Sequence, residues 1–135
     1  MDSWALYQKT VFVVGEGVLP QALPEMFGIV TGWNPAGAIA SEAENDRADR
    51  QLFAALEEAG KDPVRITGCS PDRSHAEAGW LFSCDRETAI LWGGRFRQKA
   101  VYWVTGDRLW LIACDRSERP CVLGSFRARI VAPLE

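Results

Sequence analysis

The chain has 135 residues, of which 47% are hydrophobic and 24% are charged, and its formal net charge at pH 7 is -3. This length fits one folded domain, residues 1–135, and the composition excludes a disordered chain, a fibrous protein and a disulfide-rich scaffold. The acidic balance provides no overall attraction to nucleic acid or to anionic membranes.

The first half of the sequence predicts two strands separated by a loop. Residues 4–14 end in the run Thr-Val-Phe-Val-Val, which is typical of a strand. Residues 15–26 contain two prolines and are predicted to form a loop. Residues 27–33 form the second predicted strand, with Gly28 and Gly32 on one face, where a packed helix could approach the backbone closely.

A helix is predicted after the strand exit at Asn34 and Pro35, because proline ends the strand. Ser41 is placed to cap this helix, with Glu44 completing a capping box. An apolar stripe continues to residue 59, and Gly60 ends the helix. Asn45 lies on that buried stripe, so its amide needs hydrogen-bonding partners.

The middle of the chain predicts two short strands, at residues 64–68 and 80–84, joined by a polar loop that contains His75. Asp85 can cap a second helix, whose apolar stripe runs to residue 100. Gly93 and Gly94 interrupt this helix. Either a neighbouring backbone packs against them or the helix breaks there.

Residues 100–105 and 108–114 flank a two-residue turn and predict a β-hairpin in which Trp103 lies opposite Trp110. Both faces of this hairpin are apolar. We therefore expect helices to cover one face and a terminal segment or a second subunit to cover the other. A last strand is expected within residues 121–131. The tryptophan pair is interpreted as core or dimer contact, and base stacking in an RNA-binding domain is the alternative.

The order of these elements predicts an α+β fold of the ferredoxin-like type. Its split βαβ arrangement has an antiparallel sheet with two helices, here extended by extra strands at both ends. A different α+β topology is the alternative.

Several segments resemble a bacterial family known as domain of unknown function 3293. The residues that carry the resemblance lie at 31–35, then at Ser41, Glu44, Asn45, Arg50 and Leu52, with further landmarks at 7–10, 68–71, Trp80 and 95–100. The chain departs from the family pattern after the middle tryptophan and at the end of the second helix. The resemblance implies a shared fold unit and transfers no chemistry.

A polar cluster at the strand exit is the first candidate site. Its candidate ligand-binding residues are Trp33, Asn34, Ser41, Asn45, Arg50 and Gln98. A strand end beside a helix amino terminus gathers free N–H groups and positive dipole, which favours an anion. The structural alternative is that Asn34 makes a turn, Ser41 caps the helix and Asn45 ties the helix to the loop.

Other chemistries have weaker patterns. Cys69, Ser70 and His75 could form an activated nucleophile, but no orienting carboxylate stands at a recognisable offset. One histidine and four scattered cysteines provide no metal-ligand set, so no metal or cofactor is expected, and the thiols are expected to be reduced.

Charge is distributed unevenly along the chain. Residues 1–90 carry 7 Lys/Arg against 14 Asp/Glu, whereas residues 91–135 carry 8 against 4. These halves are expected to neutralise each other within the fold or across a dimer contact. The alternative is a basic face that meets an anionic partner, built from Arg95, Arg97, Lys99, Arg127 and Arg129.

The leading functional hypothesis is a non-catalytic cytoplasmic module that self-associates and binds a small anionic ligand or a protein at the strand exit. No membrane partner is expected, because the sequence has no secretion signal and no membrane-length apolar run. A hydrolase or transferase is the second hypothesis, with Asn34, Asn45 and Arg50 positioning an anionic substrate and Asp46 or Glu44 as base. Nucleic-acid binding through the basic C-terminal third is the third and least expected.

Overall fold

The computed structural model describes residues 3–14 and 22–133, so most of the predicted loop at 15–26 lies outside the described residues. The elements follow in the order α1 (Ser3–Tyr7), β1 (Val11–Val14), β2 (Met26–Thr31), the 3-10 helix η1 (Pro35–Gly37), α2 (Glu42–Glu58), β3 (Val64–Cys69), β4 (Ala76–Ser83), α3 (Arg86–Arg95), β5 (Ala100–Thr105), β6 (Arg108–Ala113), β7 (Cys121–Ser125) and the 3-10 helix η2 (Arg127–Arg129). Within these ranges, no helix has both the length and the apolar character needed to cross a membrane.

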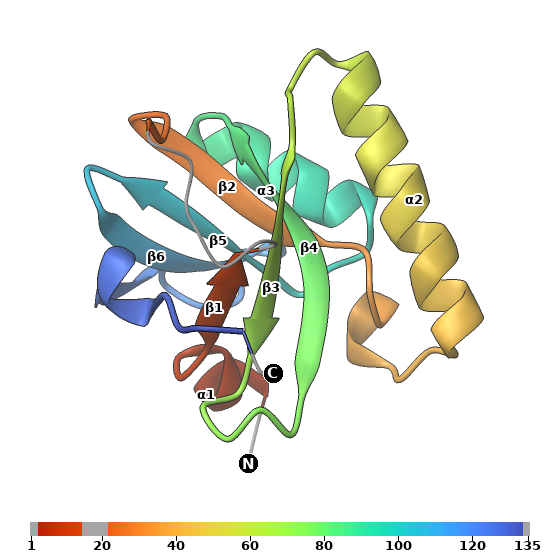
Figure 1. Ribbon diagram of the computed structural model, residues 1–135, viewed down its shortest axis with the longest axis horizontal. Coiled ribbons are helices and arrows are strands. Elements are labelled where there is room, and N and C mark those ends of the chain that lie inside the picture. The colour runs from red at the N-terminus through yellow and green to blue at the C-terminus, as the bar shows by residue number, and fades with distance from the viewer. Residues whose placement is uncertain (1–2, 15–21, 134–135) are drawn as a thin grey trace.

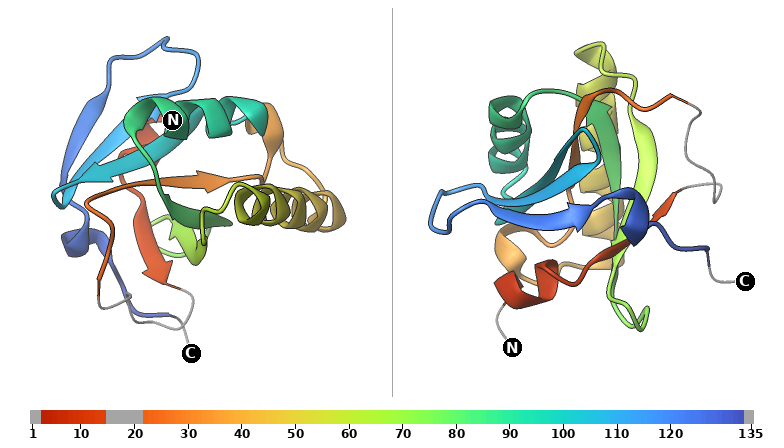
Figure 2. Two further views of the ribbon diagram at one scale, coloured as in Figure 1. Left: turned by 90° about the horizontal axis from the view of Figure 1, so that it is seen from above. Right: turned by 90° about the vertical axis from the view of Figure 1, so that its left-hand side faces the viewer.

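The strands form one antiparallel sheet in the order β1-β3-β4-β2-β5-β6-β7. The sheet curls on itself into half of a barrel (Figure 1), and Figure 2 shows the same curvature from two further sides. Phe12 in the edge strand β1 bridges Ile130, and the Val131 N–H donates to the Phe12 carbonyl at 2.9 Å. The segment after β7 therefore lies against the opposite edge of the sheet.

The ferredoxin-like prediction is wrong. The described residues carry three α-helices on a seven-stranded sheet that curls into a half barrel, rather than two helices on an extended split βαβ sheet. The order of strands and helices between residues 26 and 105 is as predicted, but element order does not report curvature. The curl has a physical cause: both faces of the sheet carry apolar side chains, and curling lets the chain ends cover the face that the long helices leave open.

The concave face holds a core of aromatic and branched side chains. Phe12, Phe27 and Phe126 are almost fully buried, and the ring centroids of Phe27 and Phe126 are 5.2 Å apart in an edge-to-face contact. Tyr102 meets Phe12 edge-on at 5.1 Å and donates its hydroxyl to the Tyr7 carbonyl at 2.8 Å. The residues before β1 and after β7 thus close this core.

Helices α2 and α3 cover the convex face. Two glycines, Gly28 and Gly32, explain how closely these helices pack on the strands. A Cβ atom at Gly28 would lie 3.0 Å from the Ala89 Cβ of α3, and one at Gly32 would lie 3.0 Å from the Ala48 carbonyl oxygen of α2. The prediction that a helix approaches this glycine face is confirmed.

Both long helices begin at the predicted caps. The Ser41 hydroxyl accepts from the Glu44 N–H at 3.1 Å while the Glu44 carboxylate accepts from the Ser41 N–H at 3.3 Å, which completes the capping box. Asp85 accepts from the Thr88 N–H at 2.8 Å and caps α3. These local patterns set where each helix starts.

The hairpin of β5 and β6 has the predicted register, with Trp103 opposite Trp110. Both tryptophans pack against the convex core, and the Trp103 indole N–H donates to the Cys84 carbonyl at 3.1 Å. On the other face, Val104 and Leu109 belong to the concave core. Helices cover one face and terminal segments cover the other, and the two tryptophans are partly buried against the convex core.

Candidate functional site

The two asparagines of the chain meet at the strand exit. The Asn34 backbone N–H donates to Asn45 Oδ1 at 2.9 Å, and Asn45 Nδ2 donates to Asn34 Oδ1 at 3.2 Å. Asn34 has a left-handed backbone with φ of 50°, a conformation that asparagine adopts more readily than most residues. Asn45 is only 6% exposed. The convergence of the two amides, which the sequence predicted, is observed.

These amides fix the loop that follows β2. Asn34 Oδ1 also accepts from the Ala40 N–H at 3.0 Å, while the Asn34 carbonyl accepts from the Gly37 N–H at 2.9 Å. The Ala36 N–H donates to the Arg97 carbonyl at 2.6 Å and ties the loop to the end of α3. Hydrogen bonds therefore tie both ends and the middle of residues 34–40 to the rest of the fold.

A carboxylate and an imidazole extend the network to the surface. Asn34 Nδ2 donates to Glu77 Oε2 at 3.1 Å, and the same oxygen lies 3.1 Å from His75 Nε2. The exposed fraction of the side chain rises from 23% at Glu77 to 66% at His75. A polar chain of four side chains thus runs from the buried face of α2 to an exposed ring.

The place of Glu77 in this network was not predicted from the sequence. Residues 69–79 were expected to form a loop, whereas β4 already begins at Ala76. Glu77 lies four residues before Leu81, which faces the concave core, so the two-residue period of the strand could have shown that the Glu77 side chain points to the same face. No local pattern could have paired it with Asn34, which lies 43 positions earlier.

Gln98 links the strand exit to the end of α3. Its Nε2 donates to the Trp33 carbonyl at 3.1 Å and to the Phe96 carbonyl at 3.2 Å. Trp33 therefore belongs to the cluster through its backbone, while its indole Nε1 is buried without a hydrogen-bond partner among the described residues. Lys99 lies beside this link: a Cβ atom at Gly37 would come within 3.0 Å of the Lys99 Nζ.

Ser41 and Arg50 do not join the amide network. Ser41 caps α2, as described above. Arg50 is exposed on α2 and makes no hydrogen bond or ion pair with the described residues. Four of the six candidate residues, Trp33, Asn34, Asn45 and Gln98, therefore hold the strand exit together.

The electrostatics of this end disfavour an anion at the start of α2. Glu42 and Glu44 already occupy its first turn, and hydrogen bonds from the Ser41 side chain and backbone hold the pKa of Glu44 below its ordinary value. On the concave side, burial and then the nearby Glu77 charge raise the pKa of the Tyr7 phenol. Negative charge therefore surrounds the amides on two sides.

The His75 loop does not form a nucleophilic triad. The imidazole contacts Glu77, while the Ser70 hydroxyl donates to Asp72 at 2.7 Å and accepts from the His75 backbone N–H at 3.1 Å. Hydrogen bonds from Ser74 and Ser70 lower the pKa of Asp72 to about 2. Cys69 is buried, and burial raises the pKa of its thiol. The chemistry of an activated thiol or hydroxyl is absent from this described loop.

Neither of two hollows of the described surface lies at the strand exit. One of about 320 Å³ lies between α3 and the loop before β7, and one of about 120 Å³ lies beside the start of β2. Among residues 3–14 and 22–133, no three His, Cys, Asp or Glu side chains gather in a way that could hold a metal ion. The strand exit is instead a surface loop tied down by the hydrogen bonds described above.

Comparison with known proteins adds one match. The family model described as "Protein of unknown function (DUF3293)" matches residues 30–101, which run from the end of β2 to the start of β5. This range contains the whole amide network and both long helices. No curated protein and no solved structure matches the chain.

Proposed function

The chain belongs to the DUF3293 family of proteins of unknown function, and we propose that it is a non-catalytic binding module that associates with a second copy of itself through the strand-exit loop. The main observation behind this proposal is the solvent exposure of Ile39. Its side chain is 94% exposed, although it lies in a loop that hydrogen bonds tie to the rest of the fold. An exposed apolar side chain on a hydrogen-bonded loop can bury its surface on a partner with less loss of backbone entropy than one on an open loop.

Charge around Ile39 favours a second copy as the partner. The loop begins beside Arg97 and Lys99 and ends at Glu42 and Glu44 in the first turn of α2. All four side chains are exposed. In a dimer with two-fold symmetry around Ile39, the basic pair of one copy faces the acidic pair of the other. This self-complementary arrangement makes a two-fold dimer the best-supported assembly.

The small anionic ligand receives less support at this place. Binding sites for small molecules are usually concave, whereas Ile39 projects from the surface. The amide groups of Asn34 and Asn45 mainly bond to each other, to the loop backbone and to Glu77. They act as a scaffold for the loop in this proposal, and the partner contacts what the loop presents.

The enzyme and nucleic-acid hypotheses also receive less support. Glu44 serves the capping box and Asp46 is exposed, so neither is a base held against the amides. In the basic C-terminal third, Arg129 uses its guanidinium on three backbone carbonyl groups rather than on a ligand. The four cysteines are free thiols, which fits a module that works in the reducing cytoplasm.

Sedimentation velocity over a concentration series tests the dimer. We expect the wild-type mass to rise from the 15.0 kDa monomer toward twice that value, with a dissociation constant above ~1 μM because one loop and a helix end make a small interface. Ile39→Ser should remove the association. Leu91→Ser, which changes a 71% exposed apolar residue on α3, should leave it intact. A wild-type monomer at all concentrations, or equal loss in both variants, would contradict the proposal.

A charge exchange tests the two-fold geometry. Lys99→Glu and Glu42→Lys should each weaken the dimer, because each places like charges across the interface. The double variant exchanges the two charges within one chain and should restore association, since each copy then meets the opposite sign again. Additive weakening in the double variant would exclude this pairing even if a dimer exists.

A further inference from the structure

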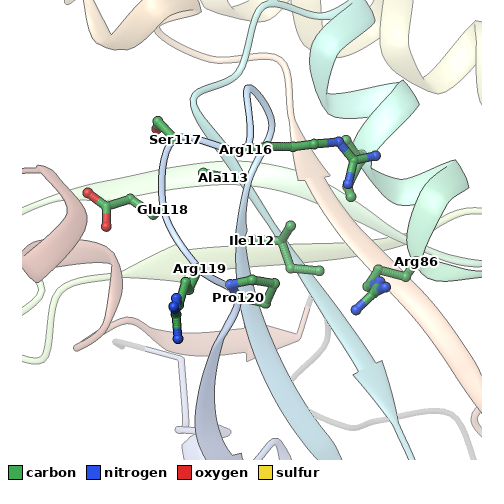
Figure 3. A pocket seen from close by; sticks show the side chains of 9 residues that line it. Arg86, Ile112, Ala113, Arg116, Ser117, Glu118, Arg119 and Pro120 are labelled. Carbon is green, nitrogen blue, oxygen red and sulfur yellow. The ribbon is translucent and has the colours of Figure 1, made fainter.

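A hollow of about 320 Å³ lies between α3 and the loop that joins β6 to β7. Figure 3 shows its walls. Ile90 from α3 and Ile112 from β6 supply apolar surface, and Pro120 supplies more from the loop. Its volume is near the lower end of the range for small-molecule sites.

Three arginines line this hollow, and two of them have no partner among the described residues. Arg86 and Arg119 make no hydrogen bond or ion pair with the residues that the structure describes. Arg116 donates to Glu87 at 2.6 Å and ties the loop to α3. Glu118 also belongs to the loop, but Figure 3 shows its carboxylate pointing away from Arg86. Two positive charges are therefore available to a ligand.

The charge of Arg86 indicates the sign of that ligand. Arg86 is the first residue of α3 and lies between Asp85, which caps the helix, and Glu87 in the first turn. Asp85 already occupies the helix end and Glu87 is paired with Arg116, so the guanidinium of Arg86 is the group that would attract an anion here. The unpaired Arg119 on the facing loop adds a second donor fork.

Hydrogen bonds order the first part of the loop that carries Arg119. Asp115 accepts from the Ser117 N–H at 2.9 Å, and hydrogen bonds from Ser117 hold the pKa of Asp115 below its ordinary value. Arg116 has a left-handed backbone, and its N–H donates to the Ala113 carbonyl at 3.1 Å. Together with the contact between Arg116 and Glu87, these hydrogen bonds order residues 113–117 of the wall before a ligand arrives.

We propose that this hollow binds a small phosphomonoester whose carbon skeleton is apolar or aromatic. Two unpaired guanidinium groups match the charge of a phosphate dianion, and arginine forks fit phosphate oxygens in pairs. The isoleucine and proline surface takes the carbon skeleton. Inorganic phosphate lacks the apolar part, and a neutral alcohol lacks the charge, so each should bind more weakly than the ester.

Calorimetric titration with phenyl phosphate, inorganic phosphate and phenol tests this proposal. We expect phenyl phosphate to bind wild-type protein more tightly than either of the other two. The double variant Arg86→Gln/Arg119→Gln should lose at least ~10-fold in affinity. The control variant Arg50→Gln/Arg127→Gln removes the same net charge elsewhere and should bind as the wild type does. Methyl NMR should show the Ile90 and Ile112 signals moving on titration.

Each contrary result overturns the site in a specific way. Equal affinity for phenyl phosphate and inorganic phosphate would show that the apolar wall does not contribute. Equal loss in both double variants would show attraction by net charge alone. The absence of binding, or signal changes confined to other residues, would also reject the proposal. Because the four substituted residues are exposed, thermal melting should show that every variant remains folded.

Discussion

The two faces of the curled sheet are covered by different means. On the convex face, helices α2 and α3 lie close to the strands because Gly28, Gly32 and Gly93 leave room for their neighbours. The concave face is closed by the ends of the chain. There, Tyr102 and Arg129 bond to backbone groups of segments that are distant in the sequence. Glycines let the helices pack closely on the convex face, whereas side-chain hydrogen bonds hold the terminal segments on the concave face.

Arg129 is the main tie on the concave side. Its Nη1 donates to the Gln8 carbonyl at 2.6 Å and to the Thr10 carbonyl at 3.1 Å, both just before β1. Its Nη2 donates to the Leu123 carbonyl of β7 at 3.2 Å. One guanidinium thus connects the two edge regions of the half barrel, where strand pairing alone would leave them apart.

The largest expected effect comes from breaking this tie. Arg129→Met keeps much of the apolar side chain but leaves three carbonyl groups without their donor, and we expect it to lower the free energy of unfolding by about 3 kcal/mol. Arg127→Met changes an exposed neighbour in the same 3-10 helix and should cost less than ~0.5 kcal/mol. Urea unfolding of both variants measures the difference. Similar losses in the two would mean that Arg129 does not close the barrel.

A pair of adjacent glycines tests the convex side. A Cβ atom at Gly93 would overlap the Val101 Cγ1 and lie 2.7 Å from the Cys114 Sγ, so Gly93→Ala should destabilise the fold by about 2 kcal/mol. At Gly94 no atom lies within 4 Å of the added Cβ, and Gly94→Ala should stabilise the fold by up to ~1 kcal/mol through helix propensity. Thermal melts of the two variants should therefore shift in opposite directions. A shared direction would show that backbone preference, not close packing, explains the glycines.

The amide network lies where the two faces meet, and Asn45 tests it. Asn45→Ala removes the acceptor of the Asn34 N–H and should lower the free energy of unfolding by about 2 kcal/mol. Asp46→Ala, one exposed position further along α2, should cost much less. Amide hydrogen exchange provides the specific readout: in Asn45→Ala, the Asn34 and Ala40 amides should exchange faster. Unchanged protection at those amides would mean that the loop holds its conformation without Asn45.

The same contrast explains what could be predicted from the sequence. The convex layer was largely predictable, because helix caps, apolar stripes and the hairpin turn at Gly106 are patterns within a few residues. The closure of the concave side was not, since Arg129 and Gln8 lie 121 positions apart and neither residue marks its partner. The predicted fold class was wrong for this reason. The elements were recognised, while the curvature depends on contacts between the chain ends.

In the candidate site, too, contacts between residues near in sequence were predictable and contacts between distant residues were not. Asn34 and Asn45 are 11 positions apart, at a strand exit and a helix start, and that spacing was enough to predict their meeting. Arg50 was grouped with them, but five residues rotate a helix by about 140° beyond a full turn, which places Arg50 on a different side of α2. Glu77 depends on the pairing of distant strands, so its part in the network required the structure.

The smallest expected effect is a pH dependence of the free energy of unfolding that arises from two thiols in the convex layer. Burial raises the pKa of the Cys84 thiol to about 11 and that of Cys114 to about 11, and both pack in the convex layer. Thiols of the unfolded chain ionise near ~8.5. The folded state therefore retains protons that the unfolded state has lost, and the free energy of unfolding should fall as the pH rises from about 8.5 to about 11.

Below this window the two thiols contribute no pH dependence. The variant Cys84→Ala/Cys114→Ala should flatten the slope of unfolding free energy against pH between roughly 9 and 10.5, whatever its absolute stability. Cys121→Ala, which removes a half-buried thiol on the edge strand β7, should retain the wild-type slope. Urea unfolding at several pH values measures all three slopes. If the slope persists in the double variant, the loss arises from other buried groups, such as the Cys69 thiol and the Tyr102 phenol, whose pKa values burial also raises.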